Sequence, residues 1–270
     1  MTQSETQWKS PLATLPGAVA LEDVEGDVAF DVTAHYGDPS GEQWALEAGR
    51  AITDRPDLAV VEVSGPDRLT WLTSISSQVL TGIAPGESRE LLIMNPQGHI
   101  EHACGAIDDG QTLYLITEAS DAQALADWLN SMRFALRVEI TISQRWWLLG
   151  SIGESGVSQC DQVALTWNDP WPGIVDGGAA YYQGKHPGES LAFHIHLVPR
   201  EQAREFWREW SEAAPKRRAA GIAAWEATRI AAWRPRLGHE TDARSMPAEL
   251  DWLRTAVHTN KGCYRGQEAV

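Results

Sequence analysis

The sequence predicts an α+β fold, and three observations lead to this prediction. Segments typical of strands and helices follow one another within residues 58–142 in the order strand, helix, three strands, helix, strand. The turns at 95–98 and 108–110 are short and rich in Gly, Asn and Asp, so they join successive strands of an antiparallel sheet. A second run of mixed segments follows from 146 to 233, and 270 residues suffice for two ordinary domains.

The first strand is expected at 58–63, a β-branched run that ends at a Ser-Gly pair. Pro66 suits the first turn of a helix because its missing N–H costs nothing there, and apolar residues at helical spacing continue this helix to Leu80. A shorter helix is expected over 44–52. Residues 1–43 are rich in Pro, Gly, Ser and acids, which favours an extended lead-in.

The remaining elements follow from the same two periodicities and from turn residues. In chain order they are strands at 90–94, 100–107 and 112–117, a helix from Ser120 or Asp121 to Phe134, a strand at 136–142, a strand that begins at Trp146, a Pro- and Gly-rich loop at 168–188, a strand at 191–198, and a helix from Pro199 to Ala213. An Ala-rich segment from Arg217 to Trp233 predicts a long last helix, which Pro235 ends.

Composition excludes several classes of function. The chain has 22 Lys and Arg against 37 Asp and Glu, a net charge of −15, which disfavours direct binding to nucleic acid or to an anionic membrane. No apolar run approaches the ~20 residues that span a bilayer, and the N-terminus has no secretion signal. The three cysteines are widely spaced, so we expect neither a disulfide framework nor a metal site, and a cytoplasmic location.

The segment 260–268 is the most informative part of the sequence. Cys263 lies between two cations, Lys261 and Arg265, and glycines stand on either side. Nearby positive charge favours a thiolate, and glycine lets the backbone approach a ligand. Such a thiolate could attack an electrophile, hold a metal or form a transient mixed disulfide. The alternative is a small residue in a tight turn, and local composition does not decide between them.

Residues 261–268 match K-G-C-Y-x-G-Q-E, the signature of the YgfZ-type folate-binding proteins. These proteins are similar to the T-protein, the aminomethyltransferase of the glycine cleavage system. The resemblance covers most of the chain. Its other motifs are His35-Tyr36-Gly37 with Arg50, the run from Val63 to Leu69 with Trp71-Leu72, the turn Asn95-Pro96-Gln97-Gly98, and the run from Arg234 to Asp242.

This resemblance implies a cloverleaf of domains around a central cavity that holds tetrahydrofolate or a derivative. Two of them are interleaved α+β domains, which we expect at 1–57 with 143–215 and at 58–142 with 216–270. The third is a C-terminal β-barrel that follows the cysteine motif. By comparison with the family, this barrel is missing from the chain.

The resemblance also implies a folate-binding accessory protein in iron–sulfur cluster assembly or repair. Its partners would be the folate and iron–sulfur client proteins, with an indirect effect on tRNA modification. Cys263 is the working thiol of this hypothesis. The expected folate contacts are Arg229, for a carboxylate of the ligand; Trp225 and Trp233, for stacking on the pterin; and Lys261 and Tyr264 of the motif itself. Packing on a helix face is an equal alternative for the first three.

Two departures from the T-protein pattern bear on catalysis. That pattern places an aspartate after a G-x-I turn, whereas residues 98–103 contain none and Glu101 is out of register. It also has R-x-E-A-G, where this chain has Ala231 in place of the glutamate; each lost charge-assisted hydrogen bond costs on the order of 1.5–3 kcal/mol. Both departures disfavour aminomethyl transfer. A tetrahydrofolate-dependent aminomethyl or methyl transferase is therefore kept only as an alternative to the accessory role, and a scaffold that has lost its ligand is the other alternative.

Histidines and acids supply weaker candidates. His194 and His196 share one face of a strand, a spacing that metals use, but two solvent-facing histidines are preferred because no third ligand is near. His99 and His102 flank Glu101, and positions at the surface or the edge of a cleft are preferred over ligation. The acids at 22–27 are expected to be solvated.

Overall fold

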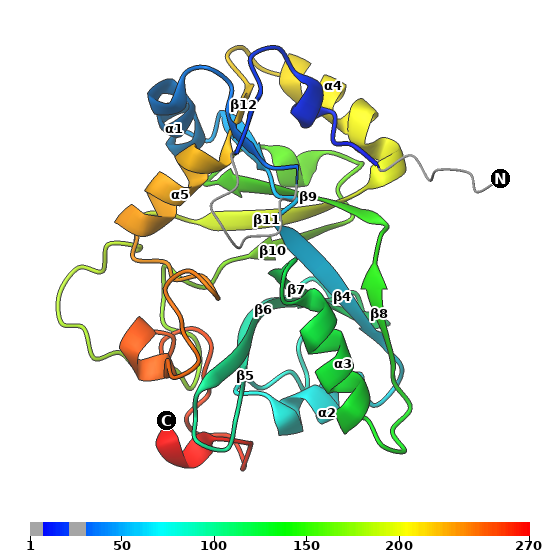
Figure 1. Ribbon diagram of the computed structural model, residues 1–270, viewed down its shortest axis with the longest axis vertical. Coiled ribbons are helices and arrows are strands. Elements are labelled where there is room, and N and C mark those ends of the chain that lie inside the picture. Colours follow the sequence, from blue (N-terminus) through cyan, green and yellow to red (C-terminus); the bar gives the residue numbers. More distant parts are fainter. Residues whose placement is uncertain (1–7, 22–30) are drawn as a thin grey trace.

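The computed structural model describes residues 8–21 and 31–270. Its fold is α+β, as predicted, with two five-stranded sheets and a short ribbon of β1 (Val19–Ala20) and β2 (Thr33–His35). The predicted cluster of acids at 22–27 lies outside the described residues. The two large sheets are stacked, with helices on the outer side of each (Figure 1).

The first large sheet uses one continuous stretch of the chain and is antiparallel throughout. In spatial order its strands are β5 (Ser88–Met94), β6 (Ile100–Asp108), β7 (Thr112–Glu118), β4 (Leu58–Ser64) and β8 (Glu139–Ser143). The helices α2 (Arg68–Ile75) and α3 (Ala122–Met132) pack on its outer face (Figure 1). Val61, Val63 and Leu115 alternate toward these helices and are fully buried, each contributing about 1.5–3 kcal/mol.

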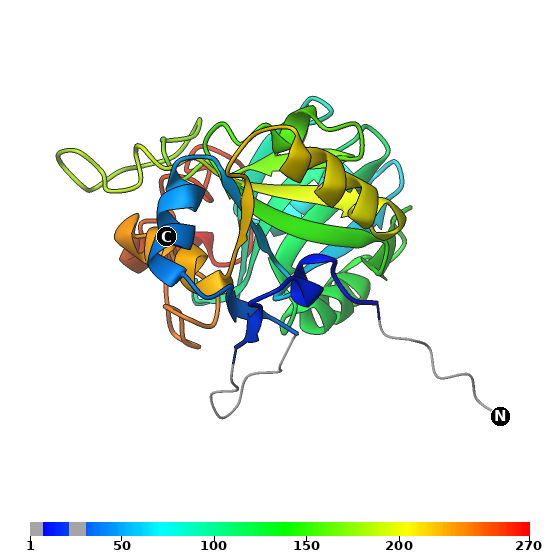
Figure 2. The same ribbon diagram turned by 90° about the horizontal axis from the view of Figure 1, so that it is seen from above.

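The second sheet gathers strands from distant parts of the chain. Its order is β10 (Leu165–Asn168), β11 (Phe193–Pro199), β9 (Trp146–Ile152), β3 (Ala51–Asp54) and β12 (Arg218–Ala220), of which only β12 and β3 are parallel. The helices α1 (Pro39–Glu47), α4 (Ala203–Glu212) and α5 (Ile222–Ala231) lie beyond it (Figures 1 and 2). One apolar cluster joins the two sheets, with Val60 and Ile116 from the first sheet against Leu148 and Ile195 from the second.

The expected helix at 44–52 is wrong at both ends. The helix begins at Pro39, where the Asp38 side chain accepts a hydrogen bond from the Gly41 N–H at 3.1 Å, and it ends at Glu47. The next residues, 51–54, form β3. All four of its residues are buried, so the strand has no alternation of apolar and polar positions by which to recognise it.

The long helix expected from Arg217 to Trp233 is also wrong in its first third, because residues 218–220 form β12 beside β3. Gly221 separates this strand from α5 and lies so close to the chain that an added Cβ would stand 2.1 Å from the Ala34 carbonyl oxygen. β12 thus belongs to the second sheet, although the predicted domain division groups 216–270 with 58–142. The helix expected to reach Leu80 ends at Ile75, since Ser76 is extended.

Candidate functional site

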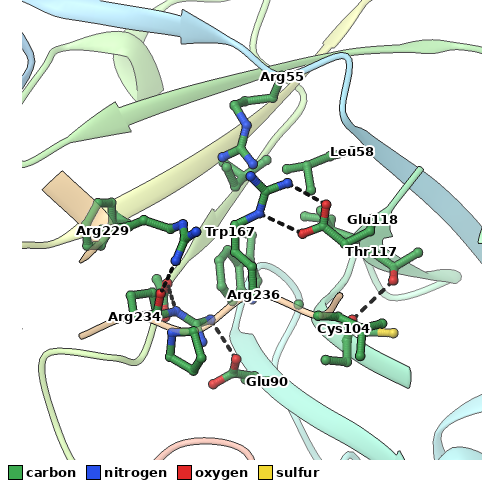
Figure 3. Close-up of a pocket in the computed structure, with 18 of the residues that line it drawn as sticks. Arg55, Leu58, Glu90, Cys104, Thr117, Glu118, Trp167, Arg229, Arg234 and Arg236 are labelled. Atoms are coloured by element: carbon green, nitrogen blue, oxygen red, sulfur yellow. Dashed lines mark hydrogen bonds and ion pairs between the residues drawn. The ribbon is translucent and has the colours of Figure 1, made fainter. Parts of the chain in front are cut away.

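A cavity of about 100 Å³ lies between the two sheets (Figure 3). β6 and β7 form one wall, while Trp167 of β10, Phe193 of β11 and Trp225 of α5 form the other. The segment 234–237 that follows α5 and the side chain of Trp252 complete the lining. Segments far apart in the sequence therefore contribute to one hollow.

Two glycines let indole rings approach the strands closely. A Cβ at Gly105 would lie 2.7 Å from the Trp167 ring, and a Cβ at Gly150 would lie 2.4 Å from the Trp225 ring. Trp167 donates its Nε1–H to the Arg89 carbonyl at 2.7 Å, while the Arg55 guanidinium lies 4.7 Å from the centre of the Trp225 ring. Both indoles are therefore fixed in the cavity wall.

Arg234 and Arg236 tie the segment after α5 to both sides of the cavity. Arg236 pairs with Glu118 at 2.5 Å (Figure 3) and also with Asp57 and Glu226, each at 2.7 Å. Arg234 pairs with Glu90 at 2.6 Å and Asp169 at 2.7 Å. Burial alone would lower the pKa of Arg234, but these two carboxylates raise it above its ordinary value, so the guanidinium stays charged.

The predicted residue Arg229 lines this cavity, but its donors are taken. Its Nε and Nη2 contact Glu226 at 2.7 and 2.5 Å, and its Nη1 donates to the Arg234 carbonyl at 3.1 Å and to Glu240 at 2.8 Å. The Nη1 of Arg234, by contrast, is buried and has no hydrogen-bond partner among the described residues. Of these two arginines, Arg234 is therefore the one with a donor that no described residue satisfies.

Cys263 is exposed and lies outside the lining of this cavity. The flanking cations bind other groups. The Lys261 ammonium contacts the carbonyls of Thr73, Ser76 at 2.5 Å and Gln78 at 3.2 Å, at the C-terminal end of α2, and burial lowers the pKa of Lys261 to about 8. Arg265 pairs with Glu101 at 3.2 Å. The predicted role of the thiol stays a prediction.

Two other predicted contact residues also lie elsewhere. Tyr264 is buried in an apolar cluster with Met94 and Trp252, and burial raises the pKa of its phenol. Trp233 is 57% exposed on the outer surface, two residues after the end of α5. Of the six predicted site residues, Trp225 and Arg229 are the two that the structure brings to the cavity.

Motifs of the resemblance do meet in space. An added Cβ at Gly266 would lie 2.5 Å from the Asn95 carbonyl oxygen, and one at Gly98 would lie 2.6 Å from the Cβ of Ala269. Both glycines have a φ of +81°, a value that side chains disfavour. The turn at 95–98 and the segment 261–268 therefore form one packed unit, which Lys261 joins to α2.

Sequence reasoning missed Arg55, Glu90 and Trp167 in the cavity wall, and it used Arg234 and Arg236 only as part of a motif. One of them had a local signal. Glu90 is a lone acid before the apolar run Leu91–Met94, and a carboxylate in a buried strand needs a cation as its partner.

The predictions for the histidines need correction. His196 is not solvent-facing: it is 2% exposed, lies 2.8 Å from the Ser151 Oγ and 2.9 Å from the Thr166 Oγ1, and burial lowers its pKa to about 3. His102 is also buried, with its Nδ1 2.9 Å from the Asp121 carboxylate. Within 8–21 and 31–270, no three His, Cys, Asp or Glu side chains gather closely enough to hold a metal ion.

No described helix combines the length and the apolar character that crossing a membrane requires. No protein-family model matches the sequence. Among solved structures, the chain is similar to glycine cleavage system aminomethyltransferase T from Bartonella henselae, with a TM-score of 0.70 and 18% identity over 94% of this chain and 70% of that one. At this identity the likeness concerns the fold. The chain therefore has a fold similar to that of the T-protein aminomethyltransferase.

Proposed function

We propose that this chain is a folate-binding accessory protein whose ligand occupies the cavity between the two sheets, and that it serves iron–sulfur cluster assembly or repair. The observation that carries the folate part is the cavity itself, with two indoles in its wall and an unpartnered guanidinium donor, in a fold similar to that of an aminomethyltransferase. The iron–sulfur part rests on the K-G-C-Y-x-G-Q-E resemblance.

The side chains around the cavity offer the kinds of contact that a reduced folate would use. Trp225 and Trp167 supply apolar indole surface to the lining, and the Arg234 Nη1 is a donor without a partner that a ring carbonyl would satisfy. A ligand carboxylate at the mouth would compete with Glu240 for Arg229, since Glu240 is the more exposed of its two acidic partners.

The carboxylates of the cavity lining are all in ion pairs, which favours ligand binding over catalysis of group transfer. Three carboxylates line the cavity, and each pairs with an arginine: Glu90 and Asp169 with Arg234, and Glu118 with Arg236. Glu101, the acid nearest to the turn at 95–98, is paired with Arg265 and does not line the cavity. A general base needs a free carboxylate within reach of the proton it removes.

The exposure of Cys263 suits a protein client better than a small ligand. Its sulfur belongs to a surface segment that Lys261 and Arg265 anchor on either side, and the cavity lining does not include it. In this proposal, folate binding and the thiol are separate parts of one activity, and each can be removed without the other.

Calorimetric titration with 5-formyltetrahydrofolate tests the binding site. We expect saturable binding by the wild type and a loss of about tenfold or more in affinity for Trp225→Phe and for Arg234→Lys, which keep bulk and charge. Trp44→Ala on the exposed face of α1 is the matched control and should bind normally. A folded wild type that binds no reduced folate would contradict the proposal and favour a scaffold that has lost its ligand.

Cys263→Ala tests the thiol separately. This variant should bind 5-formyltetrahydrofolate as the wild type does, because the sulfur lies outside the cavity lining. It should fail to restore an iron–sulfur enzyme in cells that lack the endogenous factor. Full restoration would exclude the thiol role while leaving the folate site intact, and aminomethyl transfer by the purified wild type would favour the transferase alternative.

A further inference from the structure

A second hollow, of about 500 Å³, lies on the face of the second sheet that turns away from the first sheet. Two cross-strand pairs of β10 and β11 line it, Thr166 with His196 and Asn168 with His194. These residues alternate along the strands with Trp167, Phe193 and Ile195, which line the cavity of the proposed folate site. Because successive side chains of a strand point to opposite faces, the same two strands serve two separate hollows. We call the second one the outer hollow.

A chain of hydrogen bonds fixes the direction of one donor in the outer hollow. The Ser155 hydroxyl donates to the Ser151 Oγ at 3.0 Å, and the Ser151 Oγ lies 2.8 Å from the His196 Nε2. Burial lowers the pKa of His196 to about 3, so this ring is neutral and its Nε2 accepts the Ser151 proton. The His196 Nδ1–H then donates to the Thr166 Oγ1 at 2.9 Å. The O–H of Thr166 is left without a partner among the described residues and is free to donate to a ligand.

His194 supplies an acceptor beside this donor. Its Nδ1 lies 2.7 Å from the Asn168 Oδ1, and burial lowers its pKa, so the neutral ring keeps its proton on Nδ1 and donates it to the amide oxygen. The Nε2 of His194 therefore carries a lone pair, and it makes no hydrogen bond within the described part of the chain. An acceptor of this kind suits a ligand hydroxyl.

Arg217 brings a positive charge to the lining of the outer hollow. Its guanidinium donates to the Trp210 carbonyl at 2.8 Å and to the Ser155 carbonyl at 3.3 Å, and it lies 4.9 Å from the centre of the Trp210 ring. Among the described residues, no carboxylate forms an ion pair with Arg217, whereas the next residue, Arg218, pairs with Asp38. A half-buried guanidinium without a counter-charge is suited to an anion.

We propose that the outer hollow binds a small anion that carries hydroxyl groups, as a sugar phosphate or a sugar acid does. The anionic group pairs with Arg217, the Thr166 O–H donates to a ligand oxygen, and the His194 Nε2 accepts from a ligand hydroxyl. The volume of about 500 Å³ is within the ordinary range for small-molecule sites. This site shares no lining residue with the cavity between the sheets, so it goes beyond the proposed folate function and does not depend on it.

Glu154 limits the affinity. It is the one acid in the described lining of the outer hollow, it is exposed, and its charge opposes an anion, as does the net charge of −15. We therefore expect a dissociation constant of about 0.1–1 mM for the wild type. Glu154→Gln should tighten binding about threefold by removing the repulsion, an effect that a purely structural role of the lining would not produce.

Calorimetric titration of the full chain with ribose 5-phosphate tests the proposal. Inorganic phosphate supplies the charge without the hydroxyl groups, and ribose supplies the hydroxyl groups without the charge. We expect each of them to bind at least about tenfold more weakly than ribose 5-phosphate. Gluconate distinguishes the source of the anion. Affinity at least tenfold weaker than that of ribose 5-phosphate would identify a phosphorylated ligand, affinity at least tenfold tighter a sugar acid, and similar affinity hydroxylated anions in general.

Two variants locate the binding. His194→Phe keeps a ring of similar size but removes the acceptor, and Arg217→Met removes the charge; each should weaken binding about tenfold while circular dichroism stays that of the wild type. Arg208→Met, at an exposed position of α4, is the matched control for the loss of one positive charge. If Arg217→Met fails to fold because the carbonyls of Trp210 and Ser155 lose their donor, His194→Phe and Glu154→Gln decide.

Three results would overturn the proposal. The first is no saturable binding of either ribose 5-phosphate or gluconate to the wild type. The second is inorganic phosphate that binds as tightly as ribose 5-phosphate. The third is normal binding by folded His194→Phe, since the anion would then lie elsewhere on the surface.

Discussion

Arg229 and Arg234 both line the cavity, but they differ in how many of their hydrogen-bond donors already have partners. Arg229 was the predicted partner of a ligand carboxylate, but two glutamates and a backbone carbonyl already satisfy its donors. Arg234 has a buried Nη1 without a partner, and an unmade hydrogen bond there costs free energy until a ligand supplies the acceptor. If the proposed ligand occupies this cavity, we therefore expect its affinity to depend more on Arg234 than on Arg229.

Asp54 gives a pH prediction at the residue scale. It is 5% exposed, accepts the Trp147 Nε1–H at 2.9 Å, and burial raises its pKa to about 6. The folded state thus binds this proton more tightly than the unfolded state, whose pKa is ~3.9. Stability from this group is present below pH ~4 and is lost as the pH rises through 6, on the order of 3 kcal/mol in all.

Asp54→Asn checks this by removing the titrating group while keeping an oxygen that can accept from Trp147. The free energy of unfolding in urea, measured between pH 4 and pH 7, should fall with pH more steeply in the wild type than in the variant. Curves that run parallel across this window would show that Asp54 titrates normally.

Two residues of the cavity lining were predicted correctly from the sequence because they lie on one face of one helix. Trp225 and Arg229 are four positions apart on α5, so one face brings both to the cavity. Lys261 and Tyr264 were grouped with Cys263 only because they adjoin it in the sequence. The structure gives them partners on α2 and in the cluster of Met94 and Trp252, which no local pattern reveals.

At the scale of elements, the alternation of apolar and polar residues located strands in which every second side chain is buried. It did not locate short strands whose side chains are nearly all buried. The strand expected at 100–107 is β6, Ile100–Asp108, whose first residues alternate between buried and half-buried. β3 and β12 have four and three residues, and their sequences, Ala-Ile-Thr-Asp and Arg-Ala-Ala, carry no such signal. Their pairing with each other, across the length of the chain, is what makes them strands.

The segment after α5 supplies a prediction at this scale. Arg236 is 10% exposed and holds Asp57, Glu118 and Glu226, which belong to three different parts of the fold. Arg236→Met would leave these carboxylates together without a cation, a change that costs about 3–5 kcal/mol in comparable buried pairs. Urea denaturation should show this loss, whereas Arg244→Met, at an exposed position, should stay within about 0.5 kcal/mol of the wild type. A loss under 1 kcal/mol for Arg236→Met would mean that the network contributes little.

At the scale of the whole molecule, the sheets approach each other through a glycine and an indole. Gly105→Ala would place a Cβ 2.7 Å from the Trp167 ring, which its hydrogen bond to Arg89 holds in place. We expect a loss of about 1–3 kcal/mol in stability and weaker folate binding, because the ring must move within the cavity wall. Thermal unfolding and the folate titration measure both effects, and Gly173→Ala, which has space for a methyl group, is the control. An unchanged melting temperature for Gly105→Ala would contradict this packing.

The global fold was predictable mainly through the resemblance, since periodicity alone gives the class α+β and not the arrangement of two stacked sheets. The cavity was expected from the same source, but most of its lining was not. Its walls combine residues from Arg55 to Trp252, and their meeting depends on tertiary packing that a single sequence does not express.

The joining of the turn at 95–98 to residues 261–268 has a consequence for synthesis on the ribosome. Lys261 contacts the last carbonyls of α2, and the backbone at Gly266 packs against Gly98. Both late residues leave the exit tunnel long after α2 and the turn at 95–98 have left it. During that interval a nascent chain exposes the end of α2 and the tip of this hairpin. Maturation of the early half therefore waits on translation of the late segment, and a stalled message yields a chain with that corner open to chaperones and proteases.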